Sequence, residues 1–169
     1  MLYTPKKEFE KQKTRAQLMQ YAIWLLGQRD YFSAGLFSKL KSYALDNRDA
    51  DIVLEKMVDL NYINDDRLVE MRVRNASEYP SKGPIRIRQE LLNKGSPSHL
   101  VDQYLALVDH EIWEENCKQL YLNRYRKDWD TMKERNKRVR YLVSRGFNFD
   151  SSIKVTSQSI EGHHSLLKE

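Results

Sequence analysis

Signals that end a helix recur at a fixed interval along this chain. Ala44, Gly95 and Gly146 each follow a stretch with helical periodicity, and consecutive members of this set lie 51 positions apart. Glycine suits the left-handed residue just past a helix, where Lys94 and Arg145 would also meet the negative end of the helix dipole. An equal spacing with matching chemistry predicts an internal repeat.

Helical periodicity fills each unit of this repeat. Leu18, Met19, Ala22, Ile23 and Leu26 describe one broad apolar stripe, and no run of strict alternation competes with such stripes. Start and stop signals predict three helices in each unit, at roughly 14–29, 32–43 and 47–60, then 65–79, 84–94 and 98–109, then 111–127, 130–145 and 149–157.

The expected fold is therefore all-α, an elongated and curved array of three tandem three-helix repeats. The repeats are expected over residues 14–63, 64–109 and 110–157. Residues 1–13 are expected to form a flexible basic N-terminus, and residues 158–169, which include His163 and His164, a flexible C-terminal tail.

Composition narrows the possible partners and the compartment. The net charge of +5 and the pI of about 9.2 favour an acidic partner, such as nucleic acid or an acidic protein surface. Cys117 is the only cysteine, so it is expected to be a small buried filler rather than part of a disulfide. No apolar run reaches membrane-spanning length and the N-terminus lacks a signal-peptide pattern, so a soluble, cytoplasmic monomer is expected.

The stretch from Ser81 to Gly95, SKGPIRIRQELLNKG, has a strong helix start. Gly83 suits the N-cap and Pro84 the first helical position, and the N–H groups there could hold a phosphate or carboxylate. A helical wheel places Ile85 in the apolar arc with Ile87, Leu91 and Leu92, and places Arg88 within the same arc, half-buried. Lys82 and Arg86 lie on the polar side, where Arg86 can pair with Glu90, and they can face either a partner or only water.

The strongest charge asymmetry lies between Lys118 and Arg145. This segment holds ten Lys and Arg residues against three acidic ones, whereas residues 95–117 hold five acidic residues and no Lys or Arg. Such segregation favours a binding surface over a merely solvated face. Tyr121, Tyr125 and Trp129 interleave the bases and could stack on nucleobases, but a core role is expected for them.

Four segments together resemble the RecX family, the bacterial regulators of the recombinase RecA. They are AIWLLGQRDYFSAGLFSKL (22–40), VLEKMVDLNYINDDRL (53–68), KGPIRIRQELLNKG (82–95) and SRGFNFD (144–150). They keep the family's order, and the Lys-Gly-Pro and Arg-Gly-Phe stretches are the most specific of them. The chain departs from the family at Phe32, where serine is usual, and at Gly35, Ala44 and Asn61. Phe32 and Gly35 remove a capping box and are expected to weaken the start of their helix.

The resemblance implies a regulator without enzymatic activity, cofactor or metal. Members of the family bind in the groove of the RecA–DNA filament and restrain its ATPase, strand-exchange and coprotease activities. The residues expected to face the filament or DNA are Lys82, Arg86, Arg88, Lys94, Arg124, Lys137, Arg138, Arg140 and Arg145.

An alternative from another class stays open at this point. Three-helix units with basic helices also suit a stand-alone nucleic-acid-binding module, for example a helix-turn-helix regulator with weak single- or double-stranded DNA binding. The sequence contains no P-loop, dinucleotide fingerprint, Cys-x-x-Cys or His-Glu-x-x-His motif, so an enzyme is a distant third.

Overall fold

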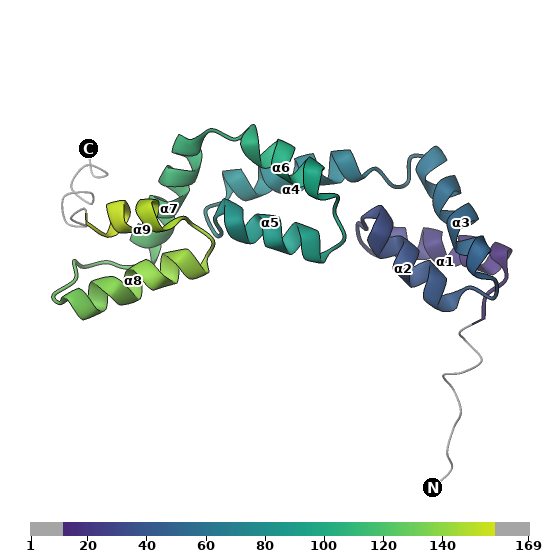
Figure 1. Ribbon diagram of the computed structural model, residues 1–169, viewed down its shortest axis with the longest axis horizontal. Helices are drawn as coiled ribbons and strands as arrows, with labels where there is room; N and C mark the ends of the chain where they lie inside the picture. Colours follow the sequence, from purple (N-terminus) through teal and green to yellow (C-terminus); the bar gives the residue numbers. More distant parts are fainter. Residues whose placement is uncertain (1–11, 158–169) are drawn as a thin grey trace, which may run out of the picture. The chain divides into compact units, whose positions relative to one another are not determined.

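The computed structural model describes residues 12–157, and nine helices follow one another in that range (Figure 1). The expected all-α class of three-helix repeats is confirmed. The helices group into two compact units. Among the described residues, the N-terminal unit takes in 12–69 and 93–97, and the C-terminal unit takes in 70–92 and 98–157. The elongated, curved arrangement stays a prediction, and the expectations for residues 1–11, for 158–169 and for His163 and His164 lie outside the described residues.

The helix bounds follow the sequence prediction within a few residues. In chain order they are α1 (Arg15–Gln28), α2 (Ser33–Tyr43), α3 (Asn47–Asp59), α4 (Asp65–Glu78), α5 (Pro84–Asn93), α6 (Ser98–Ala106), α7 (His110–Arg124), α8 (Met132–Ser144) and α9 (Phe149–Thr156). The expected 98–109 helix ends early, in a turn where the Val108 N–H donates to the Leu105 carbonyl at 3.4 Å. Helix α8 begins two residues later than expected, because the Thr131 hydroxyl accepts the Glu134 N–H at 3.2 Å and caps it.

The core of the N-terminal unit lies between α1, α2 and α3. Apolar residues at helical spacing face one another there: Leu18, Ala22, Leu25, Leu36, Leu40, Ala50, Val53, Met57 and Ile63. Ile23, which the sequence placed in the apolar stripe of α1, is instead 46% exposed beside Trp24. Burial of the stripe is what holds these short helices together, since isolated helices of such length are marginal in water.

The start of α2 is stabilised by a carboxylate from another helix. Its N-cap residue, Phe32, offers no side-chain hydrogen bond and is buried, so the expected loss of a local cap is correct. However, Asp65 of α4 accepts the Ser33 N–H at 2.8 Å and satisfies one of the open donors at this end. Phe32 therefore contributes to the core while Asp65 supplies the cap.

Lys13 is held in place, contrary to the expectation that it belongs to a flexible N-terminus. Its backbone forms a parallel bridge with Ala44, through a 2.7 Å bond from the Lys13 N–H to the Tyr43 carbonyl and a 3.0 Å bond from the Leu45 N–H to the Lys13 carbonyl. The Lys13 ammonium lies 5.4 Å from the ring centre of Tyr21 and 5.8 Å from that of Tyr43. Cation–π attraction thus adds to the backbone pairing.

Two of the three repeat-spaced positions have the expected left-handed backbone. Gly95 and Gly146 have φ values of 89° and 92°, and Asn61 takes the same region with φ 56°. Ala44, in contrast, is extended with φ −70°, because its backbone enters the bridge with Lys13 instead of turning past the helix. A Cβ on Gly95 would lie 3.2 Å from the Gly35 nitrogen, so the loop after α5 packs closely on the start of α2.

The C-terminal unit has its own apolar centre among α7, α8 and α9. Helix α9 packs on both α7 and α8, and the cluster consists of Cys117, Tyr121, Leu122, Leu142, Phe147 and Val155. Cys117 is fully buried, as expected, and burial raises the pKa of its thiol to about 12. Among the described residues, no helix is long and apolar enough to cross a membrane.

Candidate basic interface for DNA and a protein partner

The Lys-Gly-Pro and Arg-Gly-Phe stretches meet in the C-terminal unit. The Gly83 N–H donates to the Arg145 carbonyl at 2.8 Å, and the Ile85 N–H donates to the Gly146 carbonyl at 3.1 Å. A Cβ on Gly83 would lie 2.3 Å from the Gly146 oxygen, and one on Gly146 would lie 2.4 Å from the Arg86 nitrogen. Only glycine permits backbones to approach this closely.

This contact occupies two of the donors that could have held an anion at the start of α5. Pro84 has no N–H, and the N–H groups of Gly83 and Ile85 already donate to carbonyl oxygens of the loop after α8. Those two donors are therefore not available to a phosphate or carboxylate. Ile85, expected in the apolar arc, is 59% exposed, whereas Ile87 and Leu91 are buried as expected.

Lys82 and Arg86 are both engaged inside the unit. The Lys82 ammonium lies 2.5 Å from one oxygen of Glu90, and Arg86 Nε lies 3.0 Å from the other. Arg86 also donates to the Ser144 carbonyl at the end of α8 (3.1 Å). Partial burial alone would raise the pKa of Glu90, but the two basic partners outweigh it and lower the pKa. The ion pair expected between Arg86 and Glu90 is present, and both cations keep an exposed edge.

Arg88 holds α5 to α6. Its Nε lies 2.6 Å from one carboxylate oxygen of Asp102, and Nη2 lies 3.1 Å from the other. The hydrogen bond from Arg88 lowers the pKa of the Asp102 carboxyl. The expected half-burial is correct, with 44% of the Arg88 side chain exposed, and its charge is paired rather than open to a partner.

Arg138, which the sequence assigned to the partner-facing set, is instead buried. Its side chain is 5% exposed and donates to the Tyr121 hydroxyl at 3.1 Å and to the carbonyls of Lys127 and Asp128 at 2.8 and 3.3 Å. It also pairs with Glu134 one turn earlier on α8. This network fixes the loop between α7 and α8, which is why α7 ends at Arg124 rather than at 127.

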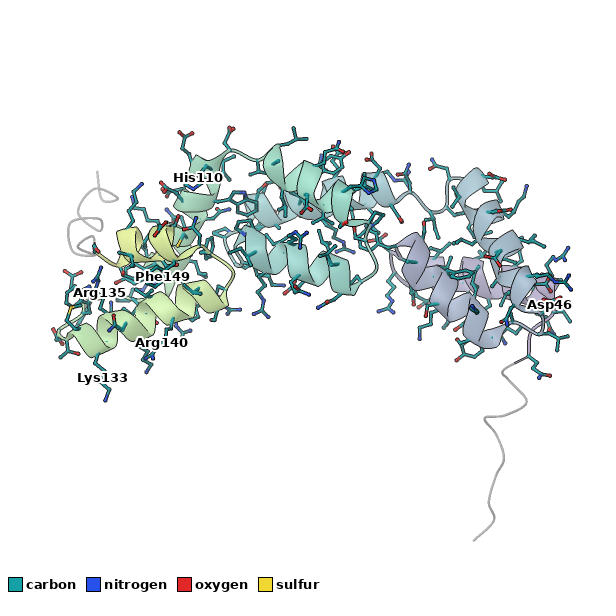
Figure 2. The ribbon with its side chains drawn as sticks, in the orientation of Figure 1. Asp46, His110, Lys133, Arg135, Arg140 and Phe149 are labelled. Carbon is teal, nitrogen blue, oxygen red and sulfur yellow. The ribbon has the colours of Figure 1, made fainter. Side chains whose placement is uncertain are left out.

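An exposed basic stripe remains on α8. Lys133, Lys137 and Arg140 follow the i, i+4, i+7 spacing of one helical face, and all three side chains are exposed. None of them forms an ion pair in the part of the chain that the structure describes. Figure 2 shows Lys133 and Arg140 extending from the side of α8 opposite α9, while Arg135 lies on the α9 side. We call these three residues the α8 stripe.

Lys133 lies in the basic segment between Lys118 and Arg145, but it is not one of the predicted site residues. Its spacing from Lys137 and Arg140 is the sequence signal that identifies it. The burial of Arg138 was not visible in the same way. A helical wheel places Arg138 on another face than the α8 stripe. It does not show that the carbonyl oxygens that accept hydrogen bonds from Arg138 come from a loop.

Two other predicted residues surround an aromatic ring near the end of α8. The guanidinium of Arg124 lies 4.4 Å from the ring centre of Tyr141, and that of Arg145 lies 5.4 Å from it. Both are cation–π distances. Arg124 is exposed and Arg145 is half-buried. Lys94 is exposed as well, but it belongs to the N-terminal unit, so it is not grouped with the others.

The aromatic residues among the bases have structural roles, as expected. Tyr121 is 1% exposed, and Tyr125 packs on the same core with its ring centre 5.2 Å from that of Tyr121. Trp129 Nε1 donates to the Thr156 carbonyl at 2.8 Å. Within residues 12–157, no group of three or more His, Cys, Asp or Glu side chains is placed to hold a metal ion.

Comparison with known proteins gives one consistent family. The family model for the second three-helix domain of RecX matches residues 64–105. The chain is 31% identical over 140 residues to a regulatory protein RecX from Acinetobacter baylyi, covering 82% of this chain and 86% of that protein. It is 33% identical over 137 residues to a regulatory protein RecX from Legionella pneumophila, covering 79% and 89%.

Solved structures agree at the level of the fold. The crystal structure of RecX from Lactobacillus salivarius matches with a TM-score of 0.72 at 24% identity, covering 85% of this chain and 94% of that one. A second crystal structure of a regulatory protein RecX gives a TM-score of 0.70 at 22% identity, covering 85% and 73%.

Proposed function

This chain belongs to the RecX family of regulatory proteins, and we propose that it inhibits the RecA recombinase by binding in the groove of the RecA–DNA filament. In this proposal it acts without catalysing a reaction and restrains the filament's ATPase, strand-exchange and coprotease activities. We also propose that the protein is located in the cytoplasm, because the filament forms there.

The α8 stripe is the observation that supports this proposal most directly. Lys133 and Arg140 lie seven positions apart, so three cations lie along about 10 Å of one helix face. Because none of them is paired within the described residues, their charge is available to DNA phosphate or to an acidic filament surface. Arg124, Arg145 and the exposed edge of Arg86 are further candidates in the same unit.

The test follows ATP hydrolysis by cognate RecA on single-stranded DNA while purified protein is added. Substoichiometric full-length protein is expected to slow hydrolysis, and the variant Lys137→Glu/Arg140→Glu is expected to lose most of this effect. The matched control is Lys39→Glu/Lys56→Glu, which changes net charge equally at exposed positions of the N-terminal unit and should inhibit normally. Arg86 is unsuitable for charge reversal, because it is hydrogen-bonded to the Ser144 carbonyl.

Binding to DNA alone separates this proposal from a stand-alone nucleic-acid module. Under the regulator hypothesis, binding to single-stranded DNA alone is weak. Its affinity falls by about 0.7 log units per neutralised phosphate for each tenfold rise in salt concentration. Tight DNA binding, together with unaltered filament ATPase, strand exchange and filament length at excess protein, would favour the nucleic-acid module instead.

A further inference from the structure

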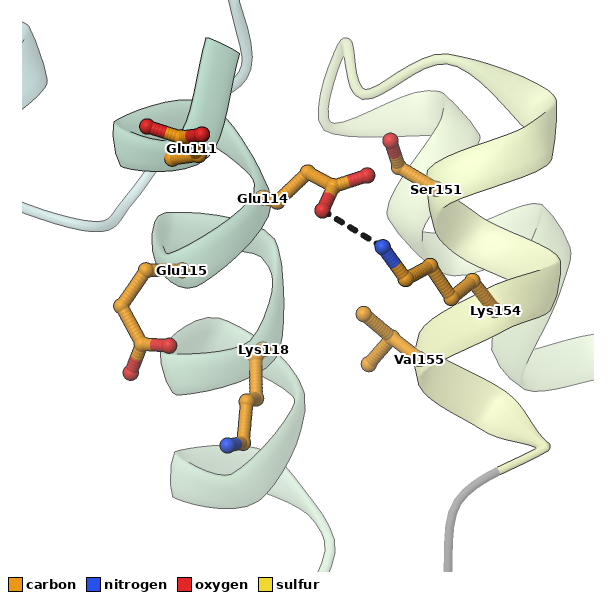
Figure 3. A pocket seen from close by; sticks show the side chains of 7 residues that line it. All are labelled: Glu111, Glu114, Glu115, Lys118, Ser151, Lys154 and Val155. Carbon is orange, nitrogen blue, oxygen red and sulfur yellow. Dashed lines mark hydrogen bonds and ion pairs between the residues drawn. The ribbon is translucent and has the colours of Figure 1, made fainter. Parts of the chain in front are cut away.

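A pocket of about 290 Å³ lies between α7 and α9. Its α7 wall consists of Glu111, Glu114, Glu115 and Lys118, and its α9 wall of Ser151, Lys154 and Val155 (Figure 3). Ligand pockets in proteins usually hold about 300–1,000 Å³, so this volume suits a single side chain better than a larger molecule. All seven residues belong to the C-terminal unit.

The pocket carries an excess of negative charge. Three carboxylates and two ammonium groups line it, which leaves one negative charge in excess. Lys154 neutralises only Glu114, at 2.7 Å, as the dashed line in Figure 3 shows. Glu115 accepts a hydrogen bond from the neutral Gln119 at 2.7 Å, and Glu111 is exposed. The one negative charge in excess favours a cationic ligand.

Ser151 is an independent sign of a ligand. The residue is 7% exposed, yet its hydroxyl makes no hydrogen bond within the described residues. The other hydroxyls of α9 and its C-cap donate to backbone carbonyls: Ser152 to Asn148, Thr156 to Ser152, and Ser157 to Ile153. Ser151 lines the pocket and its hydroxyl oxygen is not fully buried, so this oxygen opens into the pocket. Figure 3 places it on the α7 side of α9, where the Glu114 carboxylate also extends.

We propose that this pocket receives a lysine or arginine side chain from a partner protein. Val155 offers an apolar wall for the methylene stem of such a side chain, while carboxylate and hydroxyl oxygens accept hydrogen bonds from its charged head. The contact is separate from the α8 stripe, which attracts anions, so one unit carries two surfaces of opposite preference.

The experiment is an NMR titration of the full-length, ¹⁵N-labelled protein, without RecA or DNA. The probe is N-acetyl-arginine methylamide, and the neutral isostere N-acetyl-citrulline methylamide is the control ligand. The arginine probe is expected to give saturable shifts of the Ser151, Lys154 and Val155 amides with a Kd of about 1 mM, and the citrulline probe none. Since no filament is present, failure here does not bear on the regulator hypothesis, and failure of that hypothesis does not bear on this one.

Two variants test whether the Ser151 hydroxyl contributes to binding of the arginine probe. Ser151→Ala is expected to weaken binding about 10-fold, as for loss of a hydrogen bond to a charged group. Ser157→Ala, which removes a hydroxyl already bonded to the Ile153 carbonyl, should leave the Kd unchanged. Equal shifts from the citrulline probe, shifts spread evenly over Asp102 and Asp109 as well, or an unchanged Kd in Ser151→Ala would overturn the proposal. Tighter binding of spermidine than of the arginine probe would overturn it too, by identifying a polyamine rather than a protein side chain.

Discussion

Two arginines two positions apart on α8 have opposite environments. Arg138 points inward and donates to Tyr121, to Glu134 and to two loop carbonyls, whereas Arg140 lies in the exposed α8 stripe. A buried guanidinium is tolerated because nearly all of its donors find acceptors. Charge alone therefore does not separate a binding arginine from a structural one.

We expect Arg138→Ala to lower the free energy of unfolding by about 2–3 kcal/mol, since hydrogen bonds to charged groups and to the loop are lost together. Arg140→Ala should change it by no more than about 0.5 kcal/mol. Urea denaturation followed by circular dichroism measures both. Similar midpoints for the two variants would show that the Arg138 network contributes little.

A second comparison at this scale uses glycines. Gly83→Ala should destabilise by about 1–3 kcal/mol, because its new methyl group would meet the Gly146 backbone. At Gly27 of α1 nothing lies within 4 Å of the added carbon, so Gly27→Ala should stabilise by about 0.5–1 kcal/mol. Thermal melts of the two variants should move in opposite directions, and a shift of the same sign in both would contradict the close approach.

At the scale of elements, the starts of α2 and α5 are held by groups that are distant in the sequence. Asp65 caps α2 from α4, and the start of α5 is fixed by the loop after α8. Lys82, which precedes α5, and Arg86 in its first turn both pair with Glu90 one turn further along the helix. These two helix starts therefore depend on the tertiary contacts that complete them, whereas α8 is capped locally by Thr131.

Glu90 makes this contact sensitive to acid. Its pKa is lowered in the folded protein, so its stabilising effect is present above the usual value of 4.5 and is lost as pH falls through the lower, folded value. Wild type should be modestly more stable than Glu90→Gln at pH 7, and the gap should close as pH falls below 4.5. Urea midpoints from pH 7 to pH 3 test this, with Glu55→Gln as an exposed control. A gap that does not vary with pH would contradict the ion pairs.

At the scale of the whole molecule, Cys117 reports on the integrity of the C-terminal unit. It is the only cysteine, it is fully buried, and its pKa is raised to about 12, so almost no accessible thiolate exists near neutral pH. A thiol reagent at pH 8 should react with native protein on the order of 10³-fold more slowly than in urea, because reaction requires opening of the core. Rapid labelling of native protein would mean that this core opens easily.

Local patterns in the sequence determined much of this fold. The spacing of apolar residues predicted the helices, and Gly95 and Gly146 predicted two of the left-handed turns. The single cysteine was correctly expected to be a buried thiol. The basic character of α8 was also readable, because three cations on one helical face need no distant partner to be recognised. These features depend on neighbours within about one or two helical turns, which a helical wheel represents correctly.

Only the tertiary structure decided what the polar groups do. The burial of Arg138 depends on carbonyls of a loop. The donors at the start of α5 are occupied because Gly83 meets Gly146 some sixty residues away. The cap from Asp65 and the bridge from Lys13 to Ala44 likewise join distant segments. A polar group can form its hydrogen bonds with water or with a distant partner, so its sequence neighbours do not reveal which of the two it has. An apolar group is favourable only when it is buried, so the spacing of apolar residues does reveal which face of a helix is buried.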